Sequence, residues 1–181
     1  MGQLAPLALH RDAAIDAIVR ARWGRVGPGT PEEKLATMRR LTNDLRAGPG
    51  DAARGKAVFA RVCGGCHVLF GEGNRIGPEL TGANRGDTTA LLANVVDPSA
   101  VIRADWLAHT VVTRSGRVVT GLLAEQDAAA ITILDAQNRR VGIPRDEIES
   151  IEASAVSLMP ERILEQLSPE ELRDLFAWLQ R

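Results

Sequence analysis

Cys63-Gly64-Gly65-Cys66-His67 is the stretch of this chain that constrains its fold most strongly. Its two thiols stand three positions apart, a spacing at which each can add across a vinyl group of one porphyrin. The histidine that follows directly then lies under the ring, where an imidazole nitrogen binds iron. The motif therefore predicts one covalently attached c-type haem, held by Cys63 and Cys66, with His67 as a ligand of the iron.

Two other chemistries use closely spaced cysteines. A structural zinc ion needs four nitrogen or sulfur ligands, and outside the motif the chain has no further cysteine and only two histidines, His10 and His109. A redox-active cysteine pair opens a helix in a βαβ unit, whereas this pair follows a helical pattern and precedes a glycine-rich loop. We therefore prefer haem attachment to zinc binding or disulfide exchange.

The iron needs a second axial ligand, whose identity separates electron transfer from binding of an external ligand. Met159 is the first candidate, because it lies in Ser157-Leu158-Met159-Pro160, where the proline stiffens the loop. A thioether is a soft, neutral ligand that favours reduced iron and raises the potential. Packing into a gap of the core is the alternative role for this methionine. We expect His10 and His109 at the surface, although either would complete a bis-histidine site.

The loop Gly71–Leu80 follows the motif and contains Gly77-Pro78. Its glycines permit close approach of the backbone, and its proline removes a hydrogen-bond donor. A backbone carbonyl of this loop is a candidate acceptor for the ring N–H of His67, an interaction that fixes the tautomer and strengthens the ligand. Simple reversal of the chain direction is the alternative explanation for the glycines.

Charge and hydropathy exclude several classes of function. The chain has 22 Lys and Arg residues against 23 Asp and Glu residues, and no basic cluster, so we expect no nucleic-acid partner. No apolar stretch is long enough to span a bilayer, and Met1–Pro6 lacks the pattern of a signal peptide. Because haem is normally attached outside the cytoplasmic membrane, we expect a periplasmic or extracytoplasmic location and a chain that is a mature fragment or an excised domain.

Hydrophobic periodicity and capping residues predict five helices. They cover about 12–23, a segment that begins at Thr30-Pro31-Glu32-Glu33 with Thr30 as its cap, a segment from Asp51 to the motif, one from Asp87 to Asp97-Pro98, and one that begins at Ser168. The Gly48-Pro49-Gly50 break after the second helix predicts a domain boundary. We therefore expect an N-terminal helical extension over 1–48 and a haem domain over 49–181.

From about Leu107 the periodicity changes to short β-branched runs separated by turn residues. These runs are His109–Thr113, Val118–Leu123, Ile131–Leu134 and Val141–Ile143. They predict a small antiparallel sheet. The expected fold is a mainly α haem core, with this β-sheet inserted at about 107–153 and the helical extension before it.

The order of capped helix, C-x-x-C-H, Gly-Pro loop, middle helix, Met-Pro and terminal helix resembles the monohaem cytochrome c fold. More narrowly, residues 50 to 181 resemble the haem-binding domain of Planctomycetes and Verrucomicrobia, the Pirellula/Verrucomicrobium type. The motifs that carry this resemblance are Gly55–Phe59, Cys63–His67, Gly77–Gly82, Asp97-Pro98-Ser99, the Thr113–Gly121 hairpin, Ser157–Pro160 and Leu172–Leu175.

The resemblance implies that Cys63 and Cys66 form the thioether links, that His67 and Met159 are the axial ligands, and that the Pro78 region supports the histidine. It also implies electron transfer without catalysis, from a dehydrogenase that is a partner protein or a fused domain to a respiratory acceptor. The alternative is a haem sensor of gas or redox state, in which the methionine is labile or absent from iron. A peroxidase would need distal acid–base groups, and the sequence assigns none.

Overall fold

The computed structural model describes residues 14, 17–18, 25–26 and 29–181. Apart from three of its residues, the helix expected at about 12–23 lies outside the described part of the chain, as does His10. The chain divides into two compact units. Residues 29–100 and 159–181 form the helical unit, and residues 101–158, with the described residues before 29, belong to the sheet unit.

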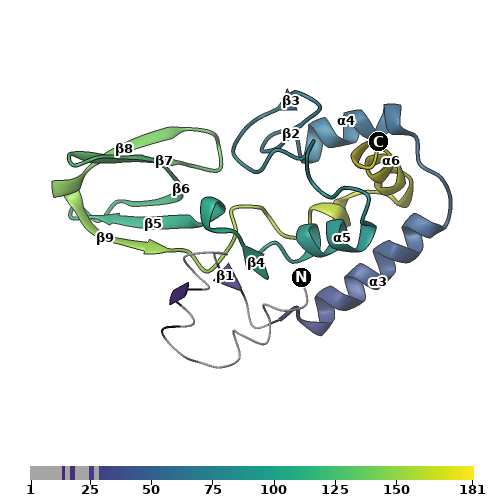
Figure 1. Ribbon diagram of the computed structural model, residues 1–181, viewed down its shortest axis with the longest axis horizontal. Coiled ribbons are helices and arrows are strands. Elements are labelled where there is room, and N and C mark those ends of the chain that lie inside the picture. The colour runs from purple at the N-terminus through teal and green to yellow at the C-terminus, as the bar shows by residue number, and fades with distance from the viewer. Residues whose placement is uncertain (1–13, 15–16, 19–24, 27–28) are drawn as a thin grey trace. The chain divides into compact units, whose positions relative to one another are not determined.

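Four helices and one short 3-10 turn build the helical unit (Figure 1). They are α3 (Glu32–Arg46), α4 (Ala52–Val62), α5 (Thr88–Val96), the turn η3 (Ile163–Gln166) and α6 (Pro169–Leu179). A short hairpin follows the cysteine motif, and its two strands, β2 (Val68–Leu69) and β3 (Glu72–Gly73), have two residues each.

Side-chain caps begin three of these helices, as the sequence predicts. The Asp51 carboxylate accepts hydrogen bonds from two backbone N–H groups at the start of α4, and Asp87 accepts one at the start of α5. Ser168 and Glu171 form a reciprocal capping box on α6, so two N-terminal donors that this helix would otherwise leave unsatisfied are paired. The threonine cap expected on α3 is wrong, because that helix begins after Pro31 and has no side-chain cap.

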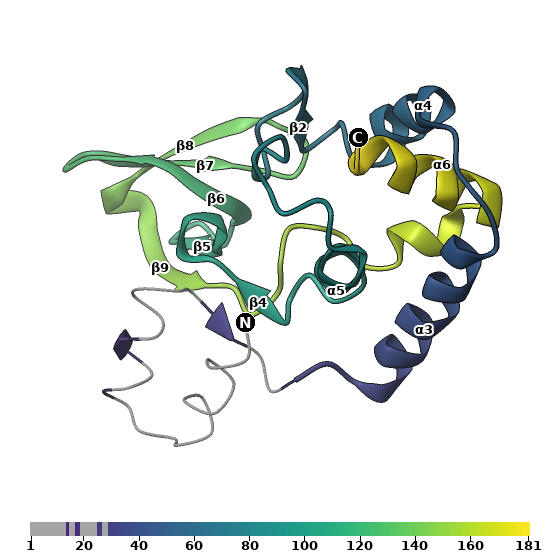
Figure 2. The ribbon, with the colours of Figure 1, turned by 45° about the vertical axis from the view of Figure 1, so that its right-hand side comes forward.

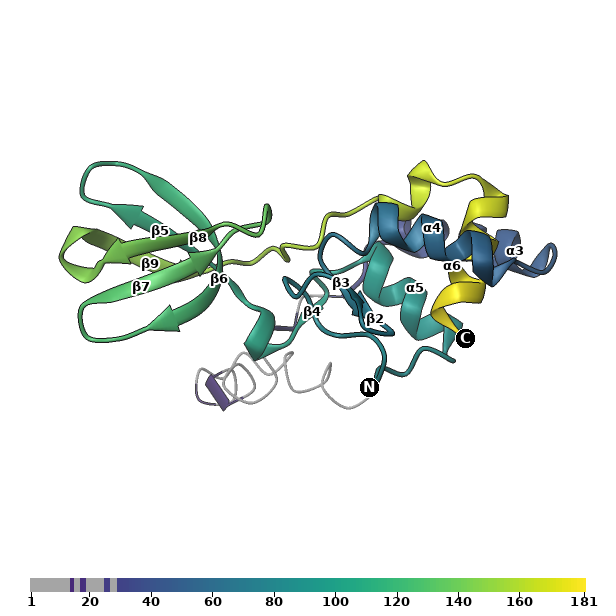
Figure 3. The same cartoon turned by 90° about the horizontal axis from the view of Figure 1, so that it is seen from above.

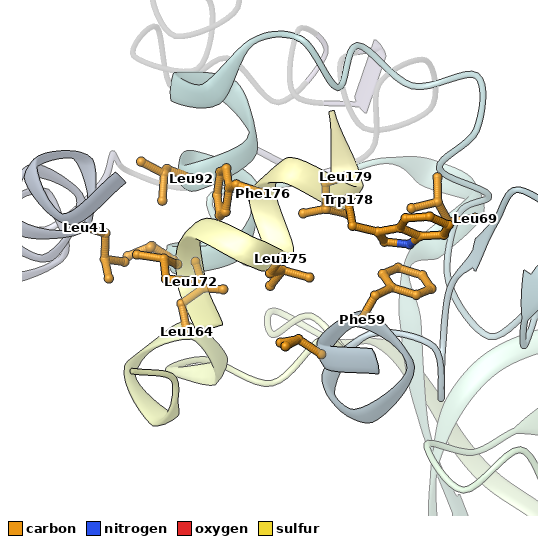
Figure 4. Packing of buried hydrophobic residues seen from close by; sticks show 12 residues of the cluster. Leu41, Phe59, Leu69, Leu92, Leu164, Leu172, Leu175, Phe176, Trp178 and Leu179 are labelled. Atoms are coloured by element: carbon orange, nitrogen blue, oxygen red, sulfur yellow. The ribbon is translucent and has the colours of Figure 1, made fainter. Parts of the chain in front are cut away.

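Helices α4 and α6 pack directly on each other in the core of the helical unit. Figure 4 shows Phe59 of α4 pointing toward Trp178 of α6, in a cluster that also contains Leu175. The two backbones approach closely at Gly55, where an added Cβ would lie 1.8 Å from the carbonyl oxygen of Asp174. Any larger residue at this position would therefore push the helices apart. Helix α3 contributes Leu41 to the same core.

The sheet unit contains five antiparallel strands in the order β8-β7-β6-β5-β9 (Figure 2). Figure 3 shows the same strands from above. These strands are β5 (Ala108–Thr113), β6 (Val118–Gln126), β7 (Ala130–Leu134), β8 (Arg140–Pro144) and β9 (Ile148–Ala153). They enclose a second core of Val111, Val119, Ile131, Ile133 and Ile143. A further short pair joins β1 (Arg25–Val26) to β4 (Val101–Ile102), and 3-10 turns lie at Ala104–Trp106 and Arg145–Glu147.

The expectation of a mainly α fold with a small inserted sheet is wrong. Helical content is 38%, and about 24% of the structure is strand, so the fold is mixed α and β. The sheet is larger than expected because β9 completes it by pairing with β5. Since the five strands bury a core of their own, the β region is a separate structural unit and not a small insertion in a helical core.

Candidate functional site

The end of α4 forms the cysteine motif into a tight turn. The backbone N–H groups of Cys63 and Gly64 both donate to the carbonyl of Phe59, each at 2.8 Å. The N–H groups of Cys66 and His67 then both donate to the carbonyl of Cys63, at 3.0 and 2.9 Å. Both cysteines are free thiols and are partly buried. These successive local hydrogen bonds therefore hold the two cysteines and the histidine close together at the end of the helix.

The Cys63 thiol packs against the apolar core of the helical unit. Burial raises the pKa of the Cys63 thiol to about 12, with the neighbouring Cys66 as a smaller cause. Burial also raises the pKa of the Cys66 thiol. Redox-active cysteine pairs have the opposite property, a lowered pKa that supplies thiolate at neutral pH. These two side chains therefore face a setting that suits an apolar ligand and not thiolate chemistry.

The imidazole of His67 is oriented by a backbone carbonyl. Its Nδ1 lies 2.8 Å from the carbonyl oxygen of Pro78. A carbonyl oxygen only accepts hydrogen bonds, so Nδ1 carries a proton, and in the neutral ring Nε2 then has the free lone pair. A histidine whose other nitrogen donates to a carbonyl is the usual arrangement of a metal-binding imidazole. Nε2 of His67 is thus the atom of this motif that can bind iron.

Two glycines make room for this histidine. A Cβ on Gly77 would lie 2.6 Å from Cε1 and 2.9 Å from Nδ1 of the His67 ring, so the ring packs directly on the backbone there. Gly73 has a φ of +111°, and a Cβ on it would lie 2.0 Å from the carbonyl oxygen of His67. The glycine-rich composition of the loop indicated close backbone approach, but not the group that is approached.

The loop around Pro78 is fixed at several points. The N–H groups of Ile76 and Gly77 donate to the carbonyl of Cys66, at 3.0 and 2.7 Å, and the N–H of Leu80 donates to the carbonyl of Val68 at 2.8 Å. These bonds wrap the loop around the cysteine motif. They hold the Pro78 carbonyl in place without help from His67.

Arg85 extends this support to the end of α6. Its guanidinium donates to the carbonyl of Thr81 at 3.2 and 3.3 Å and to the carbonyl of Leu179 at 2.5 Å. The same group lies 4.9 Å from the centre of the Phe70 ring, within the range of cation–π attraction. Sequence reasoning did not identify this role, because an isolated arginine gives no local signal of its distant acceptors.

Met159 is the first residue of the second segment of the helical unit, which places it in the same unit as His67. It is partly buried, and it precedes a loop that leads through Pro160 and Glu161 into η3. Leu164 in this turn is 3% exposed and belongs to the core. The segment after the methionine is therefore anchored by an apolar side chain.

The other candidate histidine lies in the sheet unit. His109 is in β5, where it is partly buried, and its Nδ1 has no hydrogen-bond partner among the described residues. Within residues 29–181 and the few described earlier positions, no three His, Cys, Asp or Glu side chains are grouped so that they would hold a metal ion.

The residues of the helical unit fit a covalently bound haem. Two free thiols and an imidazole with an available Nε2 lie at the end of α4, and Cys63 packs against the buried apolar cluster of the helical unit. The chemistry of this donor set suits iron, since imidazole and thioether are both established haem ligands.

A comparison with protein families identifies a family model that matches this chain. The model of the family described as Cytochrome c matches residues 52–181, from the first residue of α4 to the end of the chain. No curated protein matches this chain. In the part of the chain that the structure describes, no helix is both long and apolar enough to cross a membrane.

Proposed function

The chain belongs to the cytochrome c family, and from this we propose that it is an electron carrier with one haem c. Membership implies a covalently bound haem with iron and a function in electron transfer. In our proposal Cys63 and Cys66 form the two thioether links, and His67 and Met159 are the axial ligands. The protein acts as a carrier module and not as an enzyme.

The observation that carries this proposal is the contact between Nδ1 of His67 and the Pro78 carbonyl at 2.8 Å. A histidine free to rotate would bind iron weakly, whereas this one is fixed in a single tautomer. Its hydrogen bond also increases the electron density on the ring and so strengthens Nε2 as a ligand. The loop that supplies the carbonyl is held by its own backbone bonds, so this geometry does not depend on the ligand.

Met159 supplies the second part of the proposal. When bound, the haem would supply an iron that carries one electron at a time between two valences. The task of the protein is to keep both axial groups in place and to prevent rearrangement between the two states. A neutral thioether ligand from Met159 would favour the reduced iron, so we expect a high potential.

We further propose that the chain is of the Pirellula/Verrucomicrobium type, on the motifs that this resemblance rests on. Its electron donor is then a dehydrogenase, either a partner protein or a fused domain, and its acceptor is a respiratory protein. Haem attachment of this kind is extracytoplasmic, so we assign the protein to the periplasm. Contacts between redox partners are small and short-lived, which suits a carrier that meets two partners in turn.

Absorption spectra of the haem-loaded protein test the axial ligands. We expect a low-spin spectrum with a methionine–iron charge-transfer band in the oxidised protein, and no reaction of the reduced protein with carbon monoxide. Met159→Ala should lose the band and bind carbon monoxide, because its iron has an open face. Met38→Ala is the matched control, since Met38 packs against the core from α3, and it should keep the band.

A high-spin parent protein that binds carbon monoxide would contradict the assignment, as would a Met159→Ala variant identical to the parent. Either result would favour a sensor or a histidine-ligated haem. The mass of the intact protein would show the number of haems, since each adds one porphyrin to the chain.

A further inference from the structure

Lys34 of α3 connects two segments that are distant in the sequence. Its Nζ lies 2.6 Å from Oδ1 of Asp97 and 2.7 Å from Oε1 of Glu161. All three residues belong to the helical unit. One ammonium group therefore ties the end of α5 to the loop that follows Met159.

The Asp97 side of this bridge is a fixed point. Asp97 is 5% exposed and ends α5, ahead of Pro98. A buried carboxylate requires a partner, because an uncompensated charge in the interior is strongly unfavourable. Its hydrogen bond, followed by that of Glu161, raises the pKa of Lys34, so the lysine keeps its charge at neutral pH. Lys34 is thus firmly held at Asp97 and presents its remaining N–H groups to the loop.

The other acceptor of Lys34, Glu161, is more exposed than Asp97 and lies in the loop after Met159. The Glu161 side chain is 42% exposed, and its residue is two positions after Met159. Each residue spans at most about 3.6 Å, so fixing Glu161 confines the methionine Cα to within about 7 Å of that residue. Downstream, Arg162 has a φ of +64°, and Leu164 inserts into the core. The chain after the methionine is therefore held by an ion pair first and by an apolar anchor after it.

We propose that Lys34 is a positioning residue for Met159, and that its bond to Glu161 holds the methionine loop in place, so that the thioether would stay on the iron. This inference rests on the proposed function, in which Met159 is an axial ligand. It assigns a role in the haem site to α3, which lies outside residues 52–181 matched by the family model. The helix before the family domain then helps to hold Met159 in position as an iron ligand.

The most selective variant is Glu161→Gln, which removes the charge of the acceptor in the methionine loop and leaves the bond between Lys34 and Asp97 intact. Glu165→Gln is the matched control, because Glu165 lies in the same segment and pairs with Arg162 and not with α3. Lys34→Met is a second variant that removes the whole bridge. The measurement is the affinity of the oxidised, haem-loaded full chain for imidazole, with the methionine–iron band and the melting temperature recorded for each variant.

Imidazole binds only when the methionine has left the iron, so its apparent affinity reports the open fraction of the loop. We expect Glu161→Gln to raise this affinity about twofold to fivefold, at an unchanged melting temperature, in keeping with a partly exposed ion pair. Lys34→Met should raise it at least as much, and Glu165→Gln should match the parent.

Imidazole affinity in Glu161→Gln equal to that of the parent, while the parent shows the methionine–iron band, would overturn the role of Lys34 and leave the proposed function intact. An equal rise in Glu165→Gln would also overturn it, because the effect would then belong to the segment in general. A parent that lacks the band would instead remove the proposed ligation, and this inference with it.

Discussion

A single glycine determines whether the candidate iron ligand has room to adopt its orientation. The His67 ring lies against the backbone at Gly77 while its Nδ1 reaches the Pro78 carbonyl. These two contacts involve consecutive loop residues. The ring needs free space at position 77, and its Nδ1 needs the carbonyl of the next residue within hydrogen-bond distance. Only a residue without a side chain at position 77 satisfies both.

Gly77→Ala should therefore disturb the histidine directly. Its Cβ would come within 2.6 Å of Cε1, so the ring or the loop must move, at a cost of about 1–3 kcal/mol for an overpacked site. We expect a smaller low-spin fraction in the absorption spectrum and a lower midpoint of chemical unfolding. Gly82→Ala is the control, because nothing lies within 4 Å of a Cβ at that position. Equal behaviour of the two variants would show that the loop yields without displacing the ring.

The sequence reveals some of these residues and conceals others. The cysteine motif is a local pattern, and the candidate ligand His67 is part of it. Pro78 follows closely enough in the chain for a loop carbonyl to be considered. Lys34 gives no such signal, because its acceptors lie 63 and 127 positions away, and a pairing at that range depends on the packed helices.

At the scale of elements, the crossing of α4 and α6 depends on one buried carboxylate. Asp174 is 3% exposed and accepts hydrogen bonds from Nε and Nη2 of Arg54, at 2.6 and 2.9 Å. It also accepts one from the backbone N–H of Asp51 at 2.6 Å. The residue that caps α4 is thus bonded to the middle of α6, next to the point where Gly55 allows the helices to touch.

Asp174→Asn should lower the free energy of unfolding in a pH-dependent way. The Arg54 guanidinium, together with the Asp51 N–H, holds the pKa of Asp174 below its ordinary value. A lowered pKa in the folded state stabilises the protein above the pKa of the unfolded chain, about 3.9, and this stabilisation is lost as the pH falls towards the folded value. We expect the variant to be about 2 kcal/mol less stable at pH 7, with the difference shrinking below about pH 4.

Urea unfolding of both proteins between pH 7 and pH 3 measures this difference. Glu170→Gln serves as the control, since Glu170 pairs with the same arginine at 3.3 Å but both side chains are exposed. Loss of that pair should change stability by less than about 1 kcal/mol. A difference between Asp174→Asn and the parent that stays constant over the whole pH range would show that the carboxylate acts through its shape and not through its charge.

The helices were easier to predict than the sheet for a physical reason. Asp51, Asp87 and Ser168 are local caps, and the sequence alone indicates the helices that they begin. Strand β9 has mostly exposed side chains, with Glu149 and Glu152 in its length, so it lacks the apolar alternation that marked the other four strands. Its place is determined by pairing with β5, a long-range interaction that no local pattern contains.

At the scale of the whole molecule, two separate cores explain why a mainly α fold was the wrong expectation. The cysteine motif and the helix caps all concern the helical unit, and they say nothing of the residues between Ala100 and Met159. Those residues form the sheet unit, whose buried set includes Val111, Ile131 and Ile133, at 0–1% exposure. A chain with two cores can lose the order of one without the other.

Ile133→Ala should therefore destabilise the sheet unit selectively. Removing this fully buried side chain from β7 costs about 3 kcal/mol, through lost burial and the cavity that remains. In native-state hydrogen exchange, we expect the amides of β5 to β8 to lose protection by about that amount, while the most protected amides of α4 and α6 keep theirs. The methionine–iron band should be unchanged.

Val118→Ala on the neighbouring strand is the control, because Val118 is 61% exposed and its loss should leave both units protected. An equal loss of protection in α4 and α6 would mean that the two units unfold as one, and the sheet would then contribute directly to the stability of the haem site.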